Sequence, residues 1–187
     1  EIGTDTGIGA VVLAHAAWAC QTDATVTTVD IRQDRGRSNL HLVPGIERRV
    51  EFVEGDSNDI LPAFALDGRS FDLVFIDGAH DYEQARKDWE NVQRLSEVWV
   101  FHDTTQFTGL QRLISEIRGT GQYDVFQFAS DPGHRKDSGA VADGFCTGMT
   151  IVQHRRHLAG LTAQAHRDDR GELLPGHTET ASFALPK

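Results

Sequence analysis

The stretch EIGTDTGIG, residues 1–9, decides the fold of this chain, because it predicts the end of a strand, a glycine-rich turn and the start of a helix. Glycine allows a positive φ and lets a ligand approach the backbone closely. The pattern E-x-G-x-x-x-G-x-G differs from the G-x-G-x-x-G of dinucleotide-binding loops, and an acid stands two residues before the first glycine. A strand has to lead into such a turn, so we expect that residue 1 is not the natural start of the protein.

Strand-like and helix-like segments alternate after this turn. Apolar or β-branched runs predict strands at 25–29, 50–53, 71–76 and 98–101, and helical spacing predicts helices at 10–20, 60–66, from Asp81 onward and at 110–117. Asp81 and Gln84 have the spacing of a capping box, which predicts that Asp81 caps its helix. The alternation predicts an α/β fold with a doubly wound, mostly parallel, Rossmann-like sheet of about seven strands.

The C-terminal part of the chain has a different rhythm. Residues 123–128 and 150–153 predict two strands with no helix between them, so we expect an antiparallel hairpin at the C-terminal edge of the sheet. The glycine- and charge-rich segment 131–144 between them is a candidate substrate lid, although such segments are usually plain loops. We divide the chain into a domain at 1–154, with an incomplete N-terminus, and an arm or tail at 155–187.

Composition excludes several classes of function. The 187 residues carry a net charge of −10, which argues against a nucleic-acid-binding surface. No apolar run is long enough to span a bilayer, so we expect no membrane partner. Cys20 and Cys146 lie far apart, which argues against a zinc site or a disulfide framework and favours a cytoplasmic protein in which both are small buried hydrophobes.

Ligands of a doubly wound sheet bind beyond the carboxyl ends of its strands, so the residues that follow each strand are candidates for a site. Those residues are the glycine turn, Asp30, Asp56 with Ser57, residues 77–80 and the pair His102-Asp103. Asp30 lies where an acid would bind the ribose of a nucleoside cofactor, and its position suits S-adenosylmethionine and NAD alike. Asp56 or Ser57 can also simply cap the next helix.

Residues 1–9 and Asp30 together resemble motif I and the ribose-binding acid of class I S-adenosylmethionine-dependent methyltransferases. Carboxylates suit the positively charged sulfonium and ammonium groups of that cofactor better than a phosphate-binding loop would. In similar methyltransferases, the acid at the position of Asp56 contacts the adenine amino group. The resemblance therefore implies that S-adenosylmethionine is bound by Glu1, Gly3, Gly7, Gly9, Asp30, Asp56, Ser57 and Asp77.

Two further segments, FIDGAHDY at 75–82 and FHDT at 101–104, predict a reactive cluster. The strands that they end should be neighbours about 5 Å apart, which places Asp77 and Asp103 in the same small volume. Two carboxylates this close repel unless one holds a proton or a cation lies between them. A hard dication such as Mg²⁺, which prefers oxygen ligands, would satisfy both.

These segments resemble the group of macrocin- and mycinamicin-type sugar O-methyltransferases and cephalosporin-hydroxylase-like proteins, over residues 1 to about 153. The resemblance implies a divalent metal on Asp77 and Asp103, His80 as the general base, a small hydroxylated molecule as methyl acceptor, and assembly into a homo-oligomer. His102 stands where those proteins have an acid, and it becomes a third candidate ligand or a residue that orients Asp103. Histidine is a poorer magnesium ligand, so a weaker site, another divalent metal or no metal remain open.

Three other functions remain open at this point. The first is methyl transfer without a metal, with His80 as base or as an orienting group. The second is an NAD-binding oxidoreductase, although no Tyr-x-x-x-Lys pair supports it. The third is a non-catalytic domain that binds the cofactor or its product.

Overall fold

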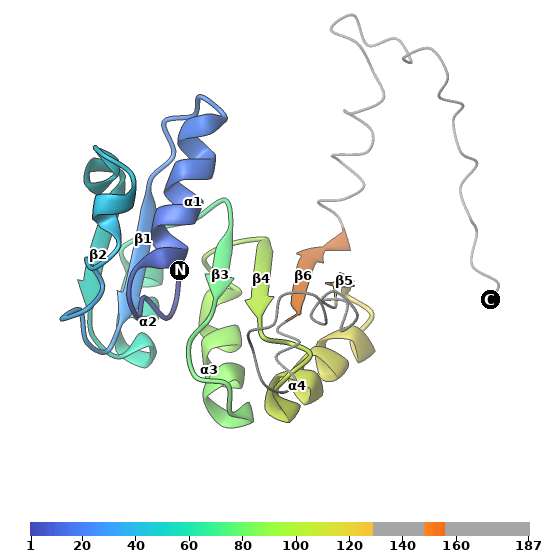
Figure 1. The fold of residues 1–187 in the computed structure, drawn as a ribbon. Coiled ribbons are helices and arrows are strands. Elements are labelled where there is room, and N and C mark those ends of the chain that lie inside the picture. Colours follow the sequence, from blue (N-terminus) through green and yellow to red (C-terminus); the bar gives the residue numbers. More distant parts are fainter. Residues whose placement is uncertain (129–147, 156–187) are drawn as a thin grey trace, which may run out of the picture.

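The computed structural model describes residues 1–128 and 148–155 (Figure 1). The predicted loop at 131–144, Cys146 and nearly all of the predicted tail at 155–187 lie outside these ranges. The strands are β1 (Val26–Asp30), β2 (Val50–Glu54), β3 (Val74–Ile76), β4 (Val98–His102), β5 (Tyr123–Phe128) and β6 (Met149–His154). The α-helices are α1 (Ile8–Ala19), α2 (Ser57–Leu66), α3 (Tyr82–Val92) and α4 (Thr108–Gly119), with short 3-10 helices η1 (Leu40–Leu42) and η2 (Ile46–Arg49).

The strands form two groups that the N-terminal residues join. β1 and β2 pair in parallel, and the other four strands follow the order β3-β4-β6-β5. Ile2 forms parallel bridges to Val29 of β1 and to Ile76 of β3. Its nitrogen donates to the Phe75 carbonyl at 2.8 Å, so the N-terminus lies between the two strand groups (Figure 1). The glycine turn after Ile2 therefore leaves from the middle of the sheet.

The predicted α/β fold is confirmed, but the number of strands agrees only in part with the seven or so that were predicted. The described residues form six strands, and the bridge of Ile2 occupies the place of the predicted first strand. β5 and β6 pair antiparallel as expected, but β6 also pairs antiparallel with β4. The last described strand thus lies inside the sheet and β5 forms its edge.

Helices cover both faces of the sheet, as a doubly wound fold requires. Buried side chains of α2, α3 and α4 form one core with residues of β3, β4 and β6, and Trp89 and Trp99 pack edge to face at its centre. Ala10, Val11 and Ala14 of α1 form a second core with Ile46 and Val50 on the opposite face. These two cores hold the helices against the sheet, so that the strand ends stay in place relative to one another.

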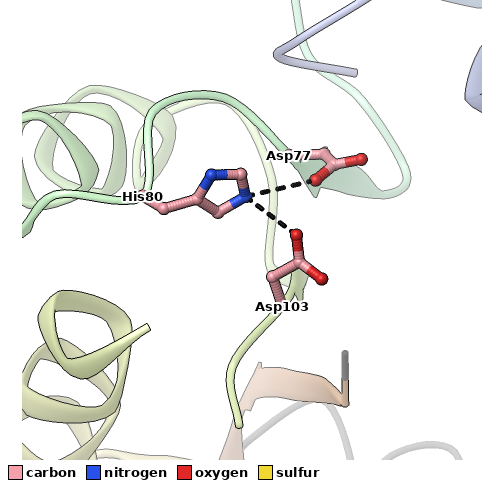
Figure 2. A group of neighbouring side chains, drawn as sticks. All are labelled: Asp77, His80 and Asp103. Atoms are coloured by element: carbon pink, nitrogen blue, oxygen red, sulfur yellow. Dashed lines mark ion pairs between the residues drawn. The ribbon is translucent and has the colours of Figure 1, made fainter. Parts of the chain in front are cut away.

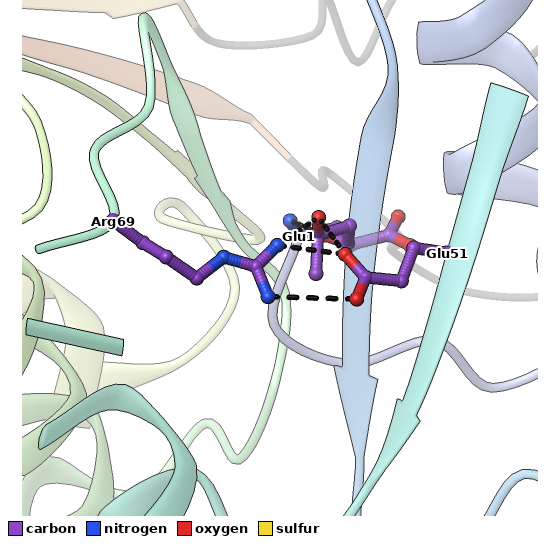
Figure 3. Close-up of polar contacts among 4 residues, drawn as sticks. Glu1, Glu51 and Arg69 are labelled. Carbon is purple, nitrogen blue, oxygen red and sulfur yellow. Dashed lines mark hydrogen bonds and ion pairs between the residues drawn. The ribbon is translucent and has the colours of Figure 1, made fainter. Parts of the chain in front are cut away.

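Arg69, in the turn after α2, makes polar contacts with both strands of the β1-β2 group (Figure 3). Its guanidinium donates to Glu51 of β2 at 2.7 Å and to the Thr27 hydroxyl of β1 at 2.9 Å. The Glu1 nitrogen in turn donates to the Thr27 carbonyl at 2.8 Å. The contact with Arg69 lowers the pKa of Glu51. Arg69 thus helps to hold Glu1 and the adjoining glycine turn in place.

Two aspartates set the start of α2 and α3. The Asp81 carboxylate accepts from the Gln84 nitrogen at 3.0 Å, which confirms the predicted cap. Asp56 caps α2 in the same way through the Asn58 nitrogen at 2.9 Å, so this helix begins at Ser57 and not at Ile60 as predicted. Such caps contribute about 0.5–2 kcal/mol each. Cys20, which we expected to be buried, is exposed just after α1. None of the described helices is long and apolar enough to cross a membrane.

Candidate active site

A pocket of ≈ 520 Å³ opens at the carboxyl ends of the central strands. It lies where the glycine turn leaves the sheet between β1 and β3. All the predicted cofactor residues except Gly7 line this pocket. They are Glu1, Gly3, Gly9, Asp30, Asp56, Ser57 and Asp77. Gly7 caps α1 with φ 77 and packs against the carbonyl of Gly36, so its role in the structure is to shape the turn.

The glycine turn brings backbone and carboxylate together at the mouth of this pocket. Gly3 has φ 94, and a Cβ there would overlap the Asp77 carbonyl. A Cβ at Gly9 would overlap the carboxylate of Glu1, which also accepts from the Thr28 hydroxyl. Burial raises the pKa of the Glu1 carboxyl, and the nearby Asp77 and Asp30 carboxylates act in the same direction. Carboxyl groups of the turn and of the ends of β1 and β3 therefore line the pocket together.

Asp30, at the end of β1, is held in a fixed orientation by the backbone. Its two carboxylate oxygens accept from the Asp5 nitrogen at 3.1 Å and the Arg32 nitrogen at 3.2 Å. Asp5 has φ 41, an uncommon conformation for a residue with a side chain. Each carboxylate oxygen can accept more than one hydrogen bond, so Asp30 can still accept from the hydroxyls of a ribose.

Asp88 of α3 is a pocket residue that our sequence analysis missed. Its side chain is buried, and it accepts from the Ser57 hydroxyl at 2.6 Å and from Gln84 at 3.0 Å. Burial raises the pKa of the Asp88 carboxyl, and the two hydrogen bonds oppose that shift. Its spacing from Ala85 and Trp89, both buried on the same helix face, was the signal that could have identified it.

Replacing Asp88 by Asn is expected to make stability less dependent on pH. Because the pKa is raised in the folded state, the protonated acid contributes most at low pH and its contribution is lost as pH rises through the folded pKa. The urea midpoint of Asp88→Asn minus that of the wild type should therefore increase between about pH 3 and about pH 8. Asp72→Asn, at an exposed position, is the control. A difference in urea midpoint that stays constant over this pH range would contradict the raised pKa of Asp88.

Asp77, His80 and Asp103 meet beside the pocket, at the ends of β3 and β4 (Figure 2). The Nε2 atom of His80 lies 3.1 Å from Asp103 Oδ2 and 3.6 Å from Asp77 Oδ1. One ligand atom from each of the three residues lies within 4.8 Å of the others, which makes the group a candidate metal site. Asp77 belongs to both this group and the pocket, so the two are continuous.

His102 joins the same group from the end of β4. Its Nδ1 atom lies 3.2 Å from Asp77 Oδ1 and 3.2 Å from Asp103 Oδ1. His102 Nδ1, His80 Nε2 and Asp103 Oδ1 are all buried, and none of them has a hydrogen-bond partner among the described residues. Burial raises the pKa of Asp77, with Asp103 acting in the same direction and the two histidines against it. The group therefore has converging donor atoms whose bonding capacity is unused.

Neighbouring residues contact this group and the turn that carries it. The ring of Phe107 stacks on that of His80, with centroids 4.2 Å apart and planes at 14°. Asp103 has φ 57, and the next residue, Thr104, is buried and accepts from the Thr150 hydroxyl of β6 at 2.9 Å. The antiparallel strand β6 thus anchors the turn that carries Asp103.

Comparisons with known proteins identify the family and the fold. A family model described as a methyltransferase domain matches residues 1–104, which include every predicted site residue. No curated protein matches the chain in sequence. An O-methyltransferase of Bacillus cereus in complex with SAH superposes with a TM-score of 0.61 at 19% identity, over 82% of this chain and 72% of that one.

Two other solved structures show the same fold. TomG of Streptomyces achromogenes, an O-methyltransferase of tomaymycin synthesis in complex with SAM, has a TM-score of 0.60 at 19% identity, over 82% of this chain and 71% of its own. CalS11, a TDP-rhamnose 3′-O-methyltransferase of calicheamicin biosynthesis, has a TM-score of 0.55 at 14% identity, over 82% of this chain and 69% of its own. The family match and the shared architecture lead to one conclusion: the chain belongs to the methyltransferase-domain family and has the class I S-adenosylmethionine-dependent methyltransferase fold.

Proposed function

We propose that this protein transfers the methyl group of S-adenosylmethionine to a hydroxyl oxygen of a small molecule, assisted by a divalent cation. The observation that carries the proposal is the shared position of Asp77, which lines the cofactor pocket and also faces His80 and Asp103. A methyl donor in the pocket and an acceptor at the cluster would meet there.

The charge of the pocket favours S-adenosylmethionine over NAD. Carboxylates of Glu1, Asp30, Asp56, Asp77 and Asp88 line it. The sulfonium and ammonium groups of S-adenosylmethionine are attracted by such a lining, whereas the two negative charges of a pyrophosphate are repelled. Asp30 would hold the ribose, and Asp56 with Ser57 would lie at the adenine.

The donor set of the cluster fits a divalent cation. Asp77 and Asp103 supply carboxylates, and His102 supplies a buried nitrogen that has no hydrogen-bond partner in the described structure. We propose these three residues as its ligands. When bound, the cation would lower the pKa of an acceptor hydroxyl.

His80 is the proposed proton acceptor. An imidazole can take a proton at neutral pH, and Phe107 fixes the direction of this ring. As the hydroxyl loses its proton to His80, its oxygen forms a bond to the methyl carbon, the carbon–sulfur bond breaks, and S-adenosylhomocysteine leaves. Most of the acceleration would come from holding the two reactants in line.

Asp30→Ala tests the cofactor assignment. We expect the affinity for S-adenosylhomocysteine to fall by about tenfold or more, because the hydrogen bonds of a charged group to the ribose are worth about 1.5–3 kcal/mol. Calorimetric titration of the full chain measures it. Asp34→Ala, an exposed acid in the following loop, should bind as the wild type does. Unchanged affinity in Asp30→Ala would reject the ribose role.

The acceptor can be searched for with a defined panel. The similarity to a TDP-rhamnose 3′-O-methyltransferase and to an O-methyltransferase of tomaymycin synthesis makes nucleotide-linked sugars and hydroxylated natural products the first compounds to test. Release of S-adenosylhomocysteine, measured with and without added dication, reports turnover. If the protein binds the cofactor but methylates none of a broad panel, the non-catalytic alternative gains support.

A further inference from the structure

Two buried imidazole nitrogens without hydrogen bonds set this cluster apart from an ordinary acidic site. His80 Nε2 and His102 Nδ1 both approach the carboxylates of Asp77 and Asp103 at 3.1–3.6 Å. At the three shorter distances, 3.1–3.2 Å, a protonated imidazole would normally donate a hydrogen bond, yet none of these contacts has hydrogen-bond geometry. The atoms lie around a common space, in which His102 Nδ1 is placed as a ligand beside the two carboxylates and His80 Nε2 as the proposed proton acceptor.

His102 follows Phe101, which pairs with Ile76, so it lies opposite Asp77, and the backbone turns in an uncommon way to bring Asp103 beside it. Successive residues of a strand point to opposite faces, so His102 and Asp103 would be expected to diverge. Asp103 instead has φ 57, in the left-handed region, just after β4 ends. His102 Nδ1 consequently lies 3.2 Å from Asp103 Oδ1, and both side chains face Asp77.

The donor atoms decide which cation fits. Mg²⁺ takes oxygen ligands, whereas imidazole suits first-row transition ions such as Co²⁺ and Zn²⁺. We propose that Asp77, His102 and Asp103 select a first-row transition-metal dication over Mg²⁺, with His102 Nδ1 as the ligand that sets the preference. This inference rests on the proposed function, because it names the cation of the same site.

Calorimetry on the chelator-treated full chain tests the preference with Co²⁺, Zn²⁺ and Mg²⁺ as probes. We expect Co²⁺ and Zn²⁺ to bind at least about tenfold more tightly than Mg²⁺. His102→Glu replaces the ligand nitrogen by oxygen. It should reduce the ratio of the Mg²⁺ to the Co²⁺ dissociation constant, mainly by strengthening Mg²⁺ binding. His41→Glu alters an exposed histidine of η1 and should leave the ratio unchanged. Equal or tighter binding of Mg²⁺ by the wild type, or an unaltered ratio in a folded His102→Glu, overturns the proposal.

Proton NMR of the Co²⁺-loaded wild type tests the ligand without relying on any variant. A coordinated histidine should give a strongly shifted ring N–H resonance that disappears in D₂O, and its absence overturns the assignment. Titration of the same sample with S-adenosylhomocysteine distinguishes a failure of the metal preference from a failure of the proposed function. Cofactor binding together with a preference for Mg²⁺ contradicts only the choice of metal, whereas Co²⁺ binding with the NMR signal but no cofactor binding supports the metal site and contradicts the proposed function.

Discussion

His80→Gln is expected to slow methyl transfer by about 10²–10⁴-fold, the usual contribution of a positioned general base. Glutamine keeps the polarity and approximate size of the side chain but cannot accept the proton of a hydroxyl at neutral pH. Because His80 does not line the cofactor pocket, the affinity for S-adenosylhomocysteine should stay within about twofold of the wild type. Single-turnover rates with the best acceptor of the panel measure the loss.

His41→Gln serves as the matched control, since His41 is exposed on η1, which lies between β1 and β2 in the chain. It should retain the wild-type rate. A His80→Gln protein that turns over as fast as this control would remove His80 from the chemistry and leave it an orienting role at most.

Asp103→Asn is expected to lower turnover by at least about 10–100-fold, as loss of a residue that holds or orients a metal ligand does. Asparagine tolerates the left-handed conformation at this position as well as aspartate does, so the turn after β4 should keep its shape. The change removes one of the two carboxylates that face His80 and His102. The expected result is loss of metal-stimulated turnover with cofactor affinity preserved.

Asp72→Asn, at an exposed position before β3, controls for the removal of one negative charge and should behave as the wild type. Asp77→Asn should lose turnover as Asp103→Asn does. If both Asp77→Asn and Asp103→Asn remain fully active on an accepted substrate, the metal model is wrong and metal-independent transfer becomes the better account.

Local patterns in the sequence predicted most of the individual elements. The strand Tyr123–Phe128 has the predicted bounds, and α3 begins directly after its predicted cap. The strand expected over residues 71–76 is shorter, Val74–Ile76, because the Phe71 nitrogen bonds to the Leu95 carbonyl of a loop and Asp72 and Leu73 are exposed. Such tertiary contacts leave no trace in local periodicity.

The order of the strands was harder to predict than their existence. A pair of antiparallel strands at the end of the chain is compatible with either strand lying next to β4. The structure places β6 there, with Val152 buried between Trp99 and Val125 of its two neighbours. Packing of these side chains decides the order, and it is a long-range property.

The candidate site shows the same division between what sequence can and cannot indicate. The rule that parallel strands present their carboxyl ends at one edge brought Asp77 and Asp103 together correctly. The parallel register of β3 and β4 pairs Ile76 with Phe101, so His102 follows opposite Asp77, whereas the positive φ that turns Asp103 toward the same face could not be predicted from strand alternation. Asp88 was overlooked because it lies within a helix and not at a strand end.

The pocket between β1 and β3 is expected to bind S-adenosylmethionine. Calorimetric titration of the full chain with S-adenosylmethionine, S-adenosylhomocysteine and NAD, each with and without added dication, tests it most directly. We expect both sulfur compounds to bind with dissociation constants on the order of micromolar, and NAD to give no signal. Binding of NAD in their place, or of none of the three, would contradict the account and leave an α/β domain whose ligand has still to be found.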